Sequence, residues 1–328
     1  MHGKERRPRI KADGAESTAA AATMTPVKPR ILRPRDLVAI VAPSGCPPYD
    51  DQIQNGVRFL EGQGLRVRVG ESVKKSRGYI GRDRALRADD LNRQFGDAKV
   101  KGIFCLVGGF SAFEILELLD YARIARAPKV FMGFSDNTSL LNAVHRKTGL
   151  VTFMGENVLW GLSEGREKSR EFFARALMDP RPPGKPPGDA AVWRDATPRR
   201  GLTVAGNLWS TVWLKGTGYE PAWRGRVYFW EDVGENVDDV NSALWHLRLG
   251  GEFRALKGMV VGHLEGIEEQ KFGVTVKQVT LKASEDEKWP VIKTESFGHH
   301  VSSWVIPIGV KCRIGGGEVE IEESGVAT

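Results

Sequence analysis

Cysteine is scarce in this 328-residue chain, and long apolar runs are missing from it. The three cysteines, Cys46, Cys105 and Cys312, are far apart, and no CxxC pair or Cys/His cluster with zinc spacing occurs. We therefore expect reduced, buried thiols and no metal site. No apolar run approaches the ~20 residues that a membrane-spanning helix needs, so we expect no membrane partner.

The N-terminal segment lacks the apolar core of an export signal. Its basic residues are followed by a stretch that contains Asp13, Glu16 and only a short alanine run. We expect residues 1–28 to form a disordered tail, with Met24 as a candidate for the true start. A cytoplasmic location is the corresponding expectation.

Excess positive charge is nearly absent from the chain after Arg35. The formal net charge is +7, but the chain up to Arg35 holds nine basic and three acidic residues. The remainder is close to neutral, so no nucleic-acid partner is expected. Neither a P-loop nor a GxGxxG fingerprint is present, which argues against a nucleotide-dependent enzyme.

Apolar segments and amphipathic segments alternate in the first half. The expected strands cover residues 37–42, 65–69, 100–107 and 129–132, and the expected helices cover residues 53–61, 82–95, 112–121 and 138–147. Gly149 follows the last helix, where a glycine commonly ends a helix. This alternation predicts an α/β fold with a parallel sheet.

The second half has a different pattern. A stretch rich in proline and glycine at residues 179–200 is typical of a linker. It divides an N-terminal domain at residues 29–178 from a smaller, mixed α/β C-terminal domain, rich in β-structure, at residues 201–328. Within the latter we expect strands at residues 226–230, 258–262 and 291–293, a helix at 236–249, and a hairpin of 310–314 with 318–321.

The first candidate site is the motif Gly133-Phe134-Ser135-Asp136-Asn137, between an apolar strand and a helix. A serine on such a turn exposes its hydroxyl at the carboxyl edge of a sheet. The amide of Asp136 would lie at an open helix N-terminus and could stabilise an oxyanion. On local grounds, a simple N-cap formed by Ser135 or Asp136 is the commoner outcome.

The second candidate is Gly108-Gly109, which follows another expected strand. Consecutive glycines allow the backbone to approach a ligand closely. They could supply a second oxyanion amide beside Ser135, and the alternative is an ordinary strand-to-helix turn.

Two further pairs supply acid and base candidates. Glu231 and Asp232 end an aromatic strand, and such a carboxylate can orient a histidine. His299 and His300 follow a later strand, and histidine is the usual general base at neutral pH. Each pair could instead be solvated loop residues, and His263 is one more plausible base.

Together these residues resemble the LD-carboxypeptidase family of serine peptidases, which also contains the microcin C immunity peptidases. The resemblance runs from about Arg33 to Ile321. The matching motifs are Ala42-Pro43-Ser44, Gly78-Tyr79-Ile80-Gly81, Arg87-Ala88-Asp89-Asp90-Leu91-Asn92, Gly108-Gly109, Gly133-Phe134-Ser135-Asp136, Gly206-Asn207-Leu208, Glu231-Asp232-Val233 and Gly298-His299.

The resemblance implies a catalytic triad of Ser135, Glu231 and His299. In the family, the glutamate comes first in the acidic pair, and the histidine stands at a fixed distance before a Pro-Ile-Gly motif. It also implies an oxyanion hole from the amides of Gly109 and Asp136, with Gly108 beside them. A homodimer and the absence of any metal or organic cofactor are implied as well.

One position departs from the murein-recycling members, which carry an arginine before the two glycines where this chain has Val107. Two substrates are therefore expected as alternatives: a murein tetrapeptide, cleaved to tripeptide and D-alanine, or an aminoacyl-nucleotide toxin. The latter requires an aromatic surface, for which the candidates are Trp160, Trp193, Trp209, Trp213 and Trp223. A non-catalytic peptide-binding protein on the same scaffold is the alternative of another class.

Overall fold

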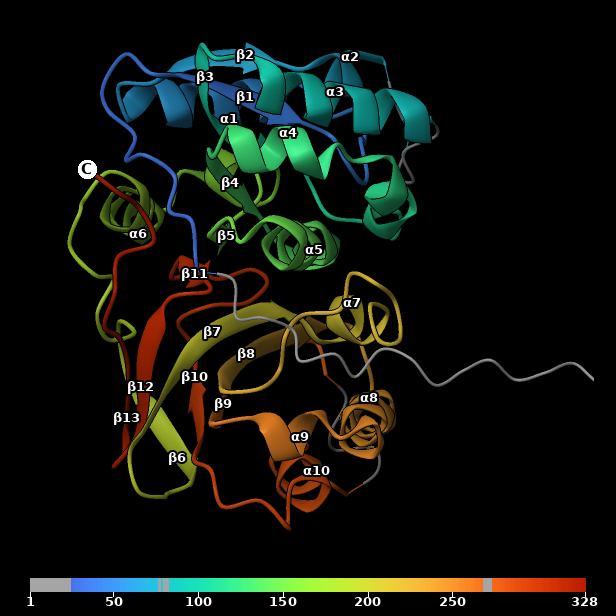
Figure 1. Cartoon of the computed structure of the whole chain (residues 1–328), viewed down its shortest axis with the longest axis vertical. Coiled ribbons are helices and arrows are strands. Elements are labelled where there is room, and N and C mark those ends of the chain that lie inside the picture. Colours follow the sequence, from blue (N-terminus) through green and yellow to red (C-terminus); the bar gives the residue numbers. More distant parts are fainter. Residues whose placement is uncertain (1–24, 76–77, 79–82, 268–272) are drawn as a thin grey trace, which may run out of the picture.

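The computed structural model describes residues 25–75, 78, 83–267 and 273–328, and these form two β-sheets, one above the other in Figure 1. The first sheet has the strand order β11-β5-β4-β3-β1-β2. Its strands are β1 (Leu37–Val41), β2 (Arg66–Val69), β3 (Val100–Cys105), β4 (Val130–Gly133), β5 (Thr152–Met154) and β11 (Ile306–Ile308). Strands β1 to β5 are parallel and β11 is antiparallel to β5, so the predicted parallel sheet is confirmed.

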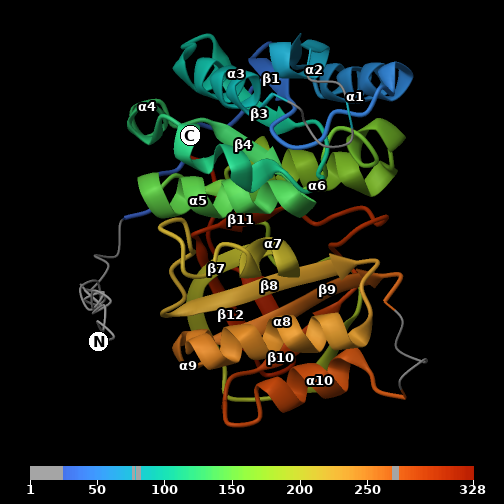
Figure 2. The ribbon, with the colours of Figure 1, turned by 90° about the vertical axis from the view of Figure 1, so that its right-hand side faces the viewer.

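Helices cover this sheet on both faces (Figures 1 and 2). They are α1 (Asp50–Gly62), α2 (Glu71–Lys75), α3 (Arg84–Gly96), α4 (Tyr121–Arg126), α5 (Thr138–Thr148) and α6 (Glu167–Leu177), with short 3₁₀ helices η1 (Ala112–Leu118), η2 (Ser135–Asn137) and η3 (Leu162–Glu164). Gly149 ends α5 at φ 75°, as expected.

The single helix expected at residues 112–121 is wrong. The 3₁₀ helix η1 stops before Leu119, whose backbone is extended, and α4 starts afresh with the carboxylate of Asp120 as its N-cap. Asp120 accepts a hydrogen bond from the amide of Arg123, and such capping favours a new helix start over a continuous helix.

The second sheet has the order β13-β12-β7-β8-β9-β10-β6 and mixed strand directions. Its strands are β6 (Ala190–Arg194), β7 (Arg199–Asn207), β8 (Arg226–Val233), β9 (Gly258–Glu265), β10 (Val291–Thr294), β12 (Lys311–Gly315) and β13 (Glu318–Ile321). Strands β7 to β10 are parallel, and the other pairings are antiparallel. The expected strands and the terminal hairpin are therefore present.

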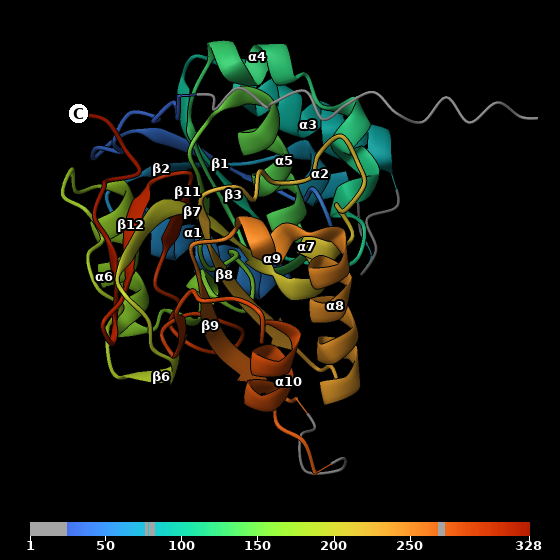
Figure 3. The ribbon, with the colours of Figure 1, turned by 60° about the horizontal axis from the view of Figure 1, so that its bottom comes forward.

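The helices of this half are α7 (Leu208–Val212), α8 (Val237–Gly250), α9 (Glu252–Ala255) and α10 (Val276–Ala283). Helices α8 and α10 lie on the face of the second sheet that is turned away from the first sheet, as the turned view in Figure 3 also shows. Within the described residues, no helix is long and apolar enough to cross a membrane.

The chain passes between the two halves more often than the sequence suggested. Strand β6 lies inside the predicted linker, and β11, in the predicted C-terminal domain, completes the first sheet. Residues 1–24 of the expected tail are outside the described residues. Residues 25–28 depart from the expectation, because Val27 exchanges backbone hydrogen bonds with Gly149 and Val151.

Two hydrophobic cores fix strand β8, which ends at the candidate acids. Val227 and Phe229 belong to the core shared by both sheets, whereas Tyr228 and Trp230 belong to the core beneath α8. This alternation is that of a strand buried on both faces. The position of Glu231 is thus set by buried residues on each side of the strand.

Candidate active site

Ser135 stands on the turn between β4 and α5 with φ 58°, a left-handed conformation that is uncommon for a residue with a side chain. A Cβ at Gly133 would lie 2.9 Å from Sγ of Cys105, so only glycine fits at the start of this turn. Neither η2 nor α5 receives an N-cap hydrogen bond from a side chain. The N-cap interpretation of Ser135 and Asp136 is therefore wrong.

Asn157 holds this turn from the loop after β5. Its side-chain oxygen accepts from the amide of Phe134 at 3.0 Å, and its side-chain NH₂ donates to the carbonyl of Phe134 at 3.2 Å. Asn137 donates to the carbonyl of Val107 at 2.9 Å, which ties the turn to the end of β3. Asn157 was not among the expected site residues, because β5, the three-residue strand before it, has no clear pattern in the sequence.

The side chain of Asp136 links three loops. Its Oδ2 accepts from the hydroxyl of Ser44 (2.6 Å) and from the amides of Ser111 and Ala112 (both 2.8 Å). Burial raises the pKa of Asp136, and these hydrogen bonds oppose the rise. The three loops at the carboxyl ends of β1, β3 and β4 thus share one acceptor.

Arg87, which was also not among the expected site residues, supports the same loops from α3. Its fully buried guanidinium donates to the carbonyls of Pro43 (2.8 Å) and Ser111 (2.9 Å) and pairs with Glu114. The side chains of Arg87 and Asp136 hold the glycine turn after β3 in place.

The two glycines after β3 lie against the serine. A Cβ at Gly108 would be 3.0 Å from Oγ of Ser135, and a Cβ at Gly109, where φ is 148°, would be 2.7 Å from Oγ of Ser44. Among the described residues, the amides of Gly109 and Asp136 have no hydrogen-bond acceptor. Both amides are thus available to a ligand beside Ser135.

The structure brings Glu231 and His299 together. Oε2 of Glu231 accepts from Nδ1 of His299 at 2.6 Å, and Glu231 is fully buried. Burial alone would lower the pKa of His299, but the charge and hydrogen bond of Glu231 outweigh it, and the net pKa is raised. The ring of Phe134 packs edge-on against the imidazole at 4.9 Å.

The structure gives the alternative acid, Asp232, and the alternative bases, His263 and His300, contacts or positions that differ from those of Glu231 and His299. Asp232 accepts from the side chain of Asn207 at 2.8 Å. His263 lies between Glu295 (2.5 Å) and Glu265 (2.9 Å). His300 lines the pocket that contains His299, with φ 59°.

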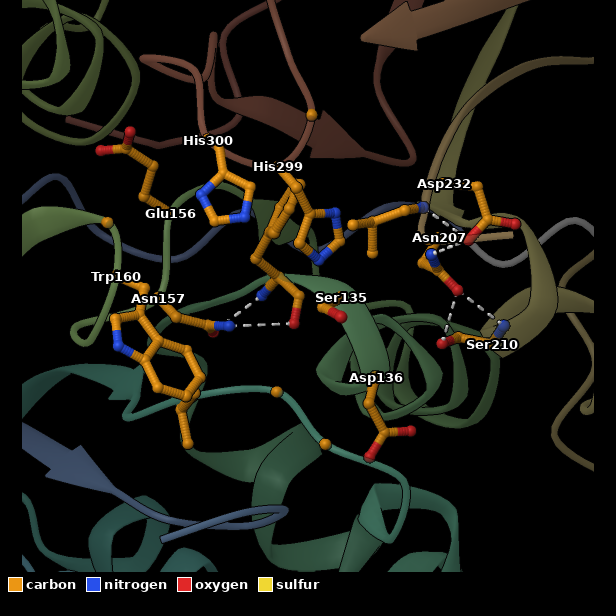
Figure 4. Close-up of a pocket in the computed structure, with 18 of the residues that line it drawn as sticks. Ser135, Asp136, Glu156, Asn157, Trp160, Asn207, Ser210, Asp232, His299 and His300 are labelled. Atoms are coloured by element: carbon orange, nitrogen blue, oxygen red, sulfur yellow. Dashed lines mark hydrogen bonds between the residues drawn. The ribbon is translucent and has the colours of Figure 1, made fainter. Parts of the chain in front are cut away.

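Ser135 and His299 line the same pocket, a cavity of about 590 Å³ between the two halves of the molecule (Figure 4). Within the described part of the chain, no hydrogen bond joins the two side chains. Such bonds are often absent before substrate binds. The pocket also contains Gly108, Gly109 and Asp136.

Aromatic and charged side chains complete the wall. Trp160, Trp209 and Trp213 line the pocket, whereas Trp193 and Trp223 pack against the core beneath α8. The charged lining residues outside the Ser135 turn are Glu156, Arg166, Asp232 and Glu235. Within the described residues, no group of three or more His, Cys, Asp or Glu side chains is arranged so that it could hold a metal ion.

The pocket contains the parts of a serine hydrolase site. These are a strained serine after a strand, a histidine that is hydrogen-bonded to a buried glutamate, and two backbone amides without an acceptor among the described residues. The chain belongs to the LD-carboxypeptidase family, since residues 38–155 match the family's N-terminal domain and residues 200–314 its C-terminal domain. It is therefore a peptidase by family. Part of one family motif, residues 79–81, is outside the described residues.

Known relatives include both branches of the family. The chain is 28% identical over 314 residues to the probable murein peptide carboxypeptidase of Bacillus subtilis, which covers 92% of this chain and 95% of the relative. It is 23% identical over 288 residues to the microcin C7 self-immunity protein MccF of Escherichia coli, with 79% and 84% covered.

The solved structure of MccF in an inactive mutant apo state superposes with a TM-score of 0.85 at 21% identity, covering 92% of this chain and all of that one. MccF in complex with aspartyl sulfamoyl adenosine gives 0.82 at 21% identity, with the same coverage. These likenesses confirm the two-sheet α/β fold.

Proposed function

We propose that this protein is a serine carboxypeptidase in which Ser135 is the nucleophile, His299 the general base and Glu231 the residue that orients it. The bond that carries the proposal is the 2.6 Å hydrogen bond between His299 and Glu231, in the pocket that also contains Ser135. The substrate is an amide next to a free carboxylate, such as the D-alanine end of a murein tetrapeptide.

The geometry supports acyl transfer. Glu231 accepts from Nδ1 of His299, which leaves Nε2 unprotonated and able to take the proton of Ser135 as the hydroxyl attacks the carbonyl carbon. His299 then gives that proton to the leaving amine. A water molecule, activated by the same base, releases the acyl group from Ser135.

The amides of Gly109 and Asp136 would bind the oxyanion. Each donor of this kind contributes ~3–4 kcal/mol to the transition state in comparable enzymes. Asp136 accepts from Ser44, Ser111 and Ala112 and so holds both amides in place before substrate arrives. Little reorganisation is then required during the reaction.

Release of D-alanine from a murein tetrapeptide tests this proposal. The wild-type protein should release D-alanine, and Ser135→Ala should release it at least about 10³-fold more slowly, because the nucleophile is lost. The melting temperature of the variant serves as a control for folding. Wild-type turnover by Ser135→Ala would overturn the assignment of the nucleophile.

An aminoacyl-nucleotide is the second candidate substrate. It is favoured by the tryptophans in the pocket, Trp160, Trp209 and Trp213, and by the likeness to MccF, which has been solved with aspartyl sulfamoyl adenosine. A base could stack on one of these indoles. Comparing kcat/KM on that compound with kcat/KM on the tetrapeptide distinguishes the two substrates.

A non-catalytic peptide-binding protein is the alternative of another class. It predicts that wild-type protein binds the tetrapeptide without releasing D-alanine. Intact Ser135, Glu231 and His299 in one arrangement favour catalysis, and any Ser135-dependent release of D-alanine excludes this alternative.

A further inference from the structure

His299 lies on a short loop of residues 298–303, which we call the histidine loop. One buried side chain holds the start of this loop. The hydroxyl of Ser303 accepts from the amide of Gly298 at 3.2 Å and donates to the carbonyl of Gly298 at 3.1 Å. Both backbone groups of the residue before His299 are thus bonded to Ser303.

The path of the histidine loop is also restricted at its two ends. Gly298 has φ 146°, and a Cβ there would lie 2.7 Å from both Cβ and the carbonyl oxygen of His263, so only glycine fits. The amide of Trp304 donates to the carbonyl of Ser296 at 2.6 Å, which joins the chain before the loop to the chain after it. The loop therefore moves as a unit.

Glu156 connects the histidine loop with the half of the molecule that carries the nucleophile. It follows β5, and β5 pairs with β11 so that Met154 lies opposite Ile306. Continued by two residues, this antiparallel register places Glu156 opposite Trp304. Oε1 of Glu156 accepts from the amide of the neighbouring Ser303 at 3.3 Å. A side chain of the first half is thereby bonded to a loop of the second half.

Arg166 makes a second connection between Glu156 and the histidine loop. Its guanidinium donates to Oε1 of Glu156 at 3.1 Å and to the carbonyl of Val301 at 3.4 Å. Glu156 is 7% exposed, so water competes little for its oxygens. Hydrogen bonds to a charged group are stronger than those between neutral groups. The contact between the two halves is therefore well placed to hold the loop.

The next residue along the chain, Asn157, holds the other part of the site. It bonds both backbone groups of Phe134, the residue before Ser135, and Figure 4 shows these two hydrogen bonds. Because Glu156 and Asn157 are consecutive, one segment holds both the turn that carries Ser135 and the loop that carries His299. The distance between the nucleophile and its base depends on this segment.

We propose that Glu156 is a positioning residue, which fixes the histidine loop relative to the Ser135 turn so that His299 can take the proton of Ser135. This inference rests on the proposed peptidase function. In the described part of the chain, the printed partner of the His299 ring is Glu231, which belongs to the same half of the molecule. The approach of His299 to Ser135 thus depends on contacts between the halves, and a misplacement of about 1 Å can lower the rate by about 10²-fold.

Two conservative variants separate the reach of Glu156 from its charge. Glu156→Gln keeps an oxygen at the same reach, and its kcat on the tetrapeptide should stay within about 3-fold of wild type. Glu156→Asp keeps the charge but withdraws the oxygens by about one C–C bond length, ~1.5 Å. It should lower kcat by at least about 10-fold and change KM by less than about 3-fold, since the loop shifts while the substrate contacts remain.

Glu156→Ala should lower kcat at least as much as Glu156→Asp, with the melting temperature of each variant as a check of folding. If the alanine variant does not fold, the comparison of Glu156→Asp with Glu156→Gln decides. A carboxylate that acted through its charge on the substrate would give the reverse order, with the larger loss in Glu156→Gln and in KM. That order, or wild-type kcat in Glu156→Asp, would overturn the inference and leave the peptidase intact.

Glu164→Ala is the matched control. Glu164 pairs with the same Arg166, but it is exposed and does not line the pocket. The variant removes one carboxylate from the same arginine without touching the contact between Glu156 and Ser303. It should leave kcat and KM within about 2-fold of wild type. A loss equal to that of Glu156→Asp would assign the effect to Arg166 and overturn the role of Glu156.

Hydrogen exchange separates this inference from the proposed function, because it needs no substrate. The amide of Ser303 donates to Glu156, so its exchange should be at least about 10-fold faster in Glu156→Asp than in wild type and unchanged in Glu164→Ala. This result in a protein that releases no D-alanine would support the held loop and overturn only the peptidase proposal. Equal exchange of the Ser303 amide in wild type and Glu156→Asp overturns the inference, whether or not D-alanine is released.

Discussion

Nδ1 of His299 lies 2.6 Å from Oε2 of Glu231, although the two residues are 68 positions apart in the chain. Glu231 is fully buried at the end of β8, while the His299 ring lines the pocket. The pair therefore connects the interior of the second sheet with the surface on which Ser135 stands.

Glu231→Gln should reduce kcat on the tetrapeptide by about 10³–10⁴-fold. A glutamine can donate to Nδ1 and so favours the tautomer that carries its proton on Nε2, which cannot accept the proton of Ser135. Steady-state release of D-alanine measures the effect, and circular dichroism checks the fold. A loss of less than about 10-fold would contradict the role of Glu231.

The pH dependence of kcat/KM should show the titration of His299. The base works in its neutral form, so activity falls as pH drops through the pKa of His299. Because Glu231 raises that pKa, the acid limb lies at higher pH than an exposed histidine would give. In Glu231→Gln the limb should move to lower pH, since burial then acts without the opposing charge. A limb that does not move would assign the titration to another group.

Gly108→Ala should lower kcat by about 10²-fold or more, because a misplacement of about 1 Å has this effect in active sites. The new Cβ would lie 2.9 Å from Cβ and 3.0 Å from Oγ of Ser135, so the nucleophile must move. Gly62→Ala is the control, because a Cβ there meets no atom closer than 4.0 Å. Equal activity of the two variants would show that the turn tolerates the shift.

Asp136→Ala should lower the free energy of unfolding by about 2–4 kcal/mol, because the buried amides of Ser111 and Ala112 and the hydroxyl of Ser44 lose their acceptor. Asp136→Asn keeps one acceptor oxygen and should lose less. Urea unfolding of both variants measures the difference. Stability equal to that of the wild type in Asp136→Ala would mean that this carboxylate does not hold the loops.

The sequence predicted those elements whose patterns are local. Strands such as Leu37–Val41 and the helix Thr138–Thr148 have continuous apolar or amphipathic patterns, and a glycine marks the end of that helix. Short elements escaped prediction: β5 has three residues, and β11 reaches its partner from the far end of the chain. Pairing over such distances leaves no local signal.

The residues of the candidate site also fall into two groups: those that a local sequence pattern indicates and those that it does not. Ser135 and the two glycines could be recognised because each follows an apolar strand, and the structure places them together. The choice of Glu231 with His299 depended on the family resemblance rather than on local pattern. Asn157 and Arg87 act through backbone groups of other loops, which no sequence spacing indicates.

The central claim is that Ser135 attacks the substrate, and trapping the acyl-enzyme tests it most directly. Wild-type protein mixed with tetrapeptide and quenched in acid should carry a tripeptidyl adduct, and mass spectrometry of a digest should place that adduct on Ser135. The same experiment is also carried out with Glu231→Gln, because in this variant the base is impaired while the nucleophile Ser135 is intact. D-alanine release with the adduct on another residue, or release that persists in Ser135→Ala, would contradict the account.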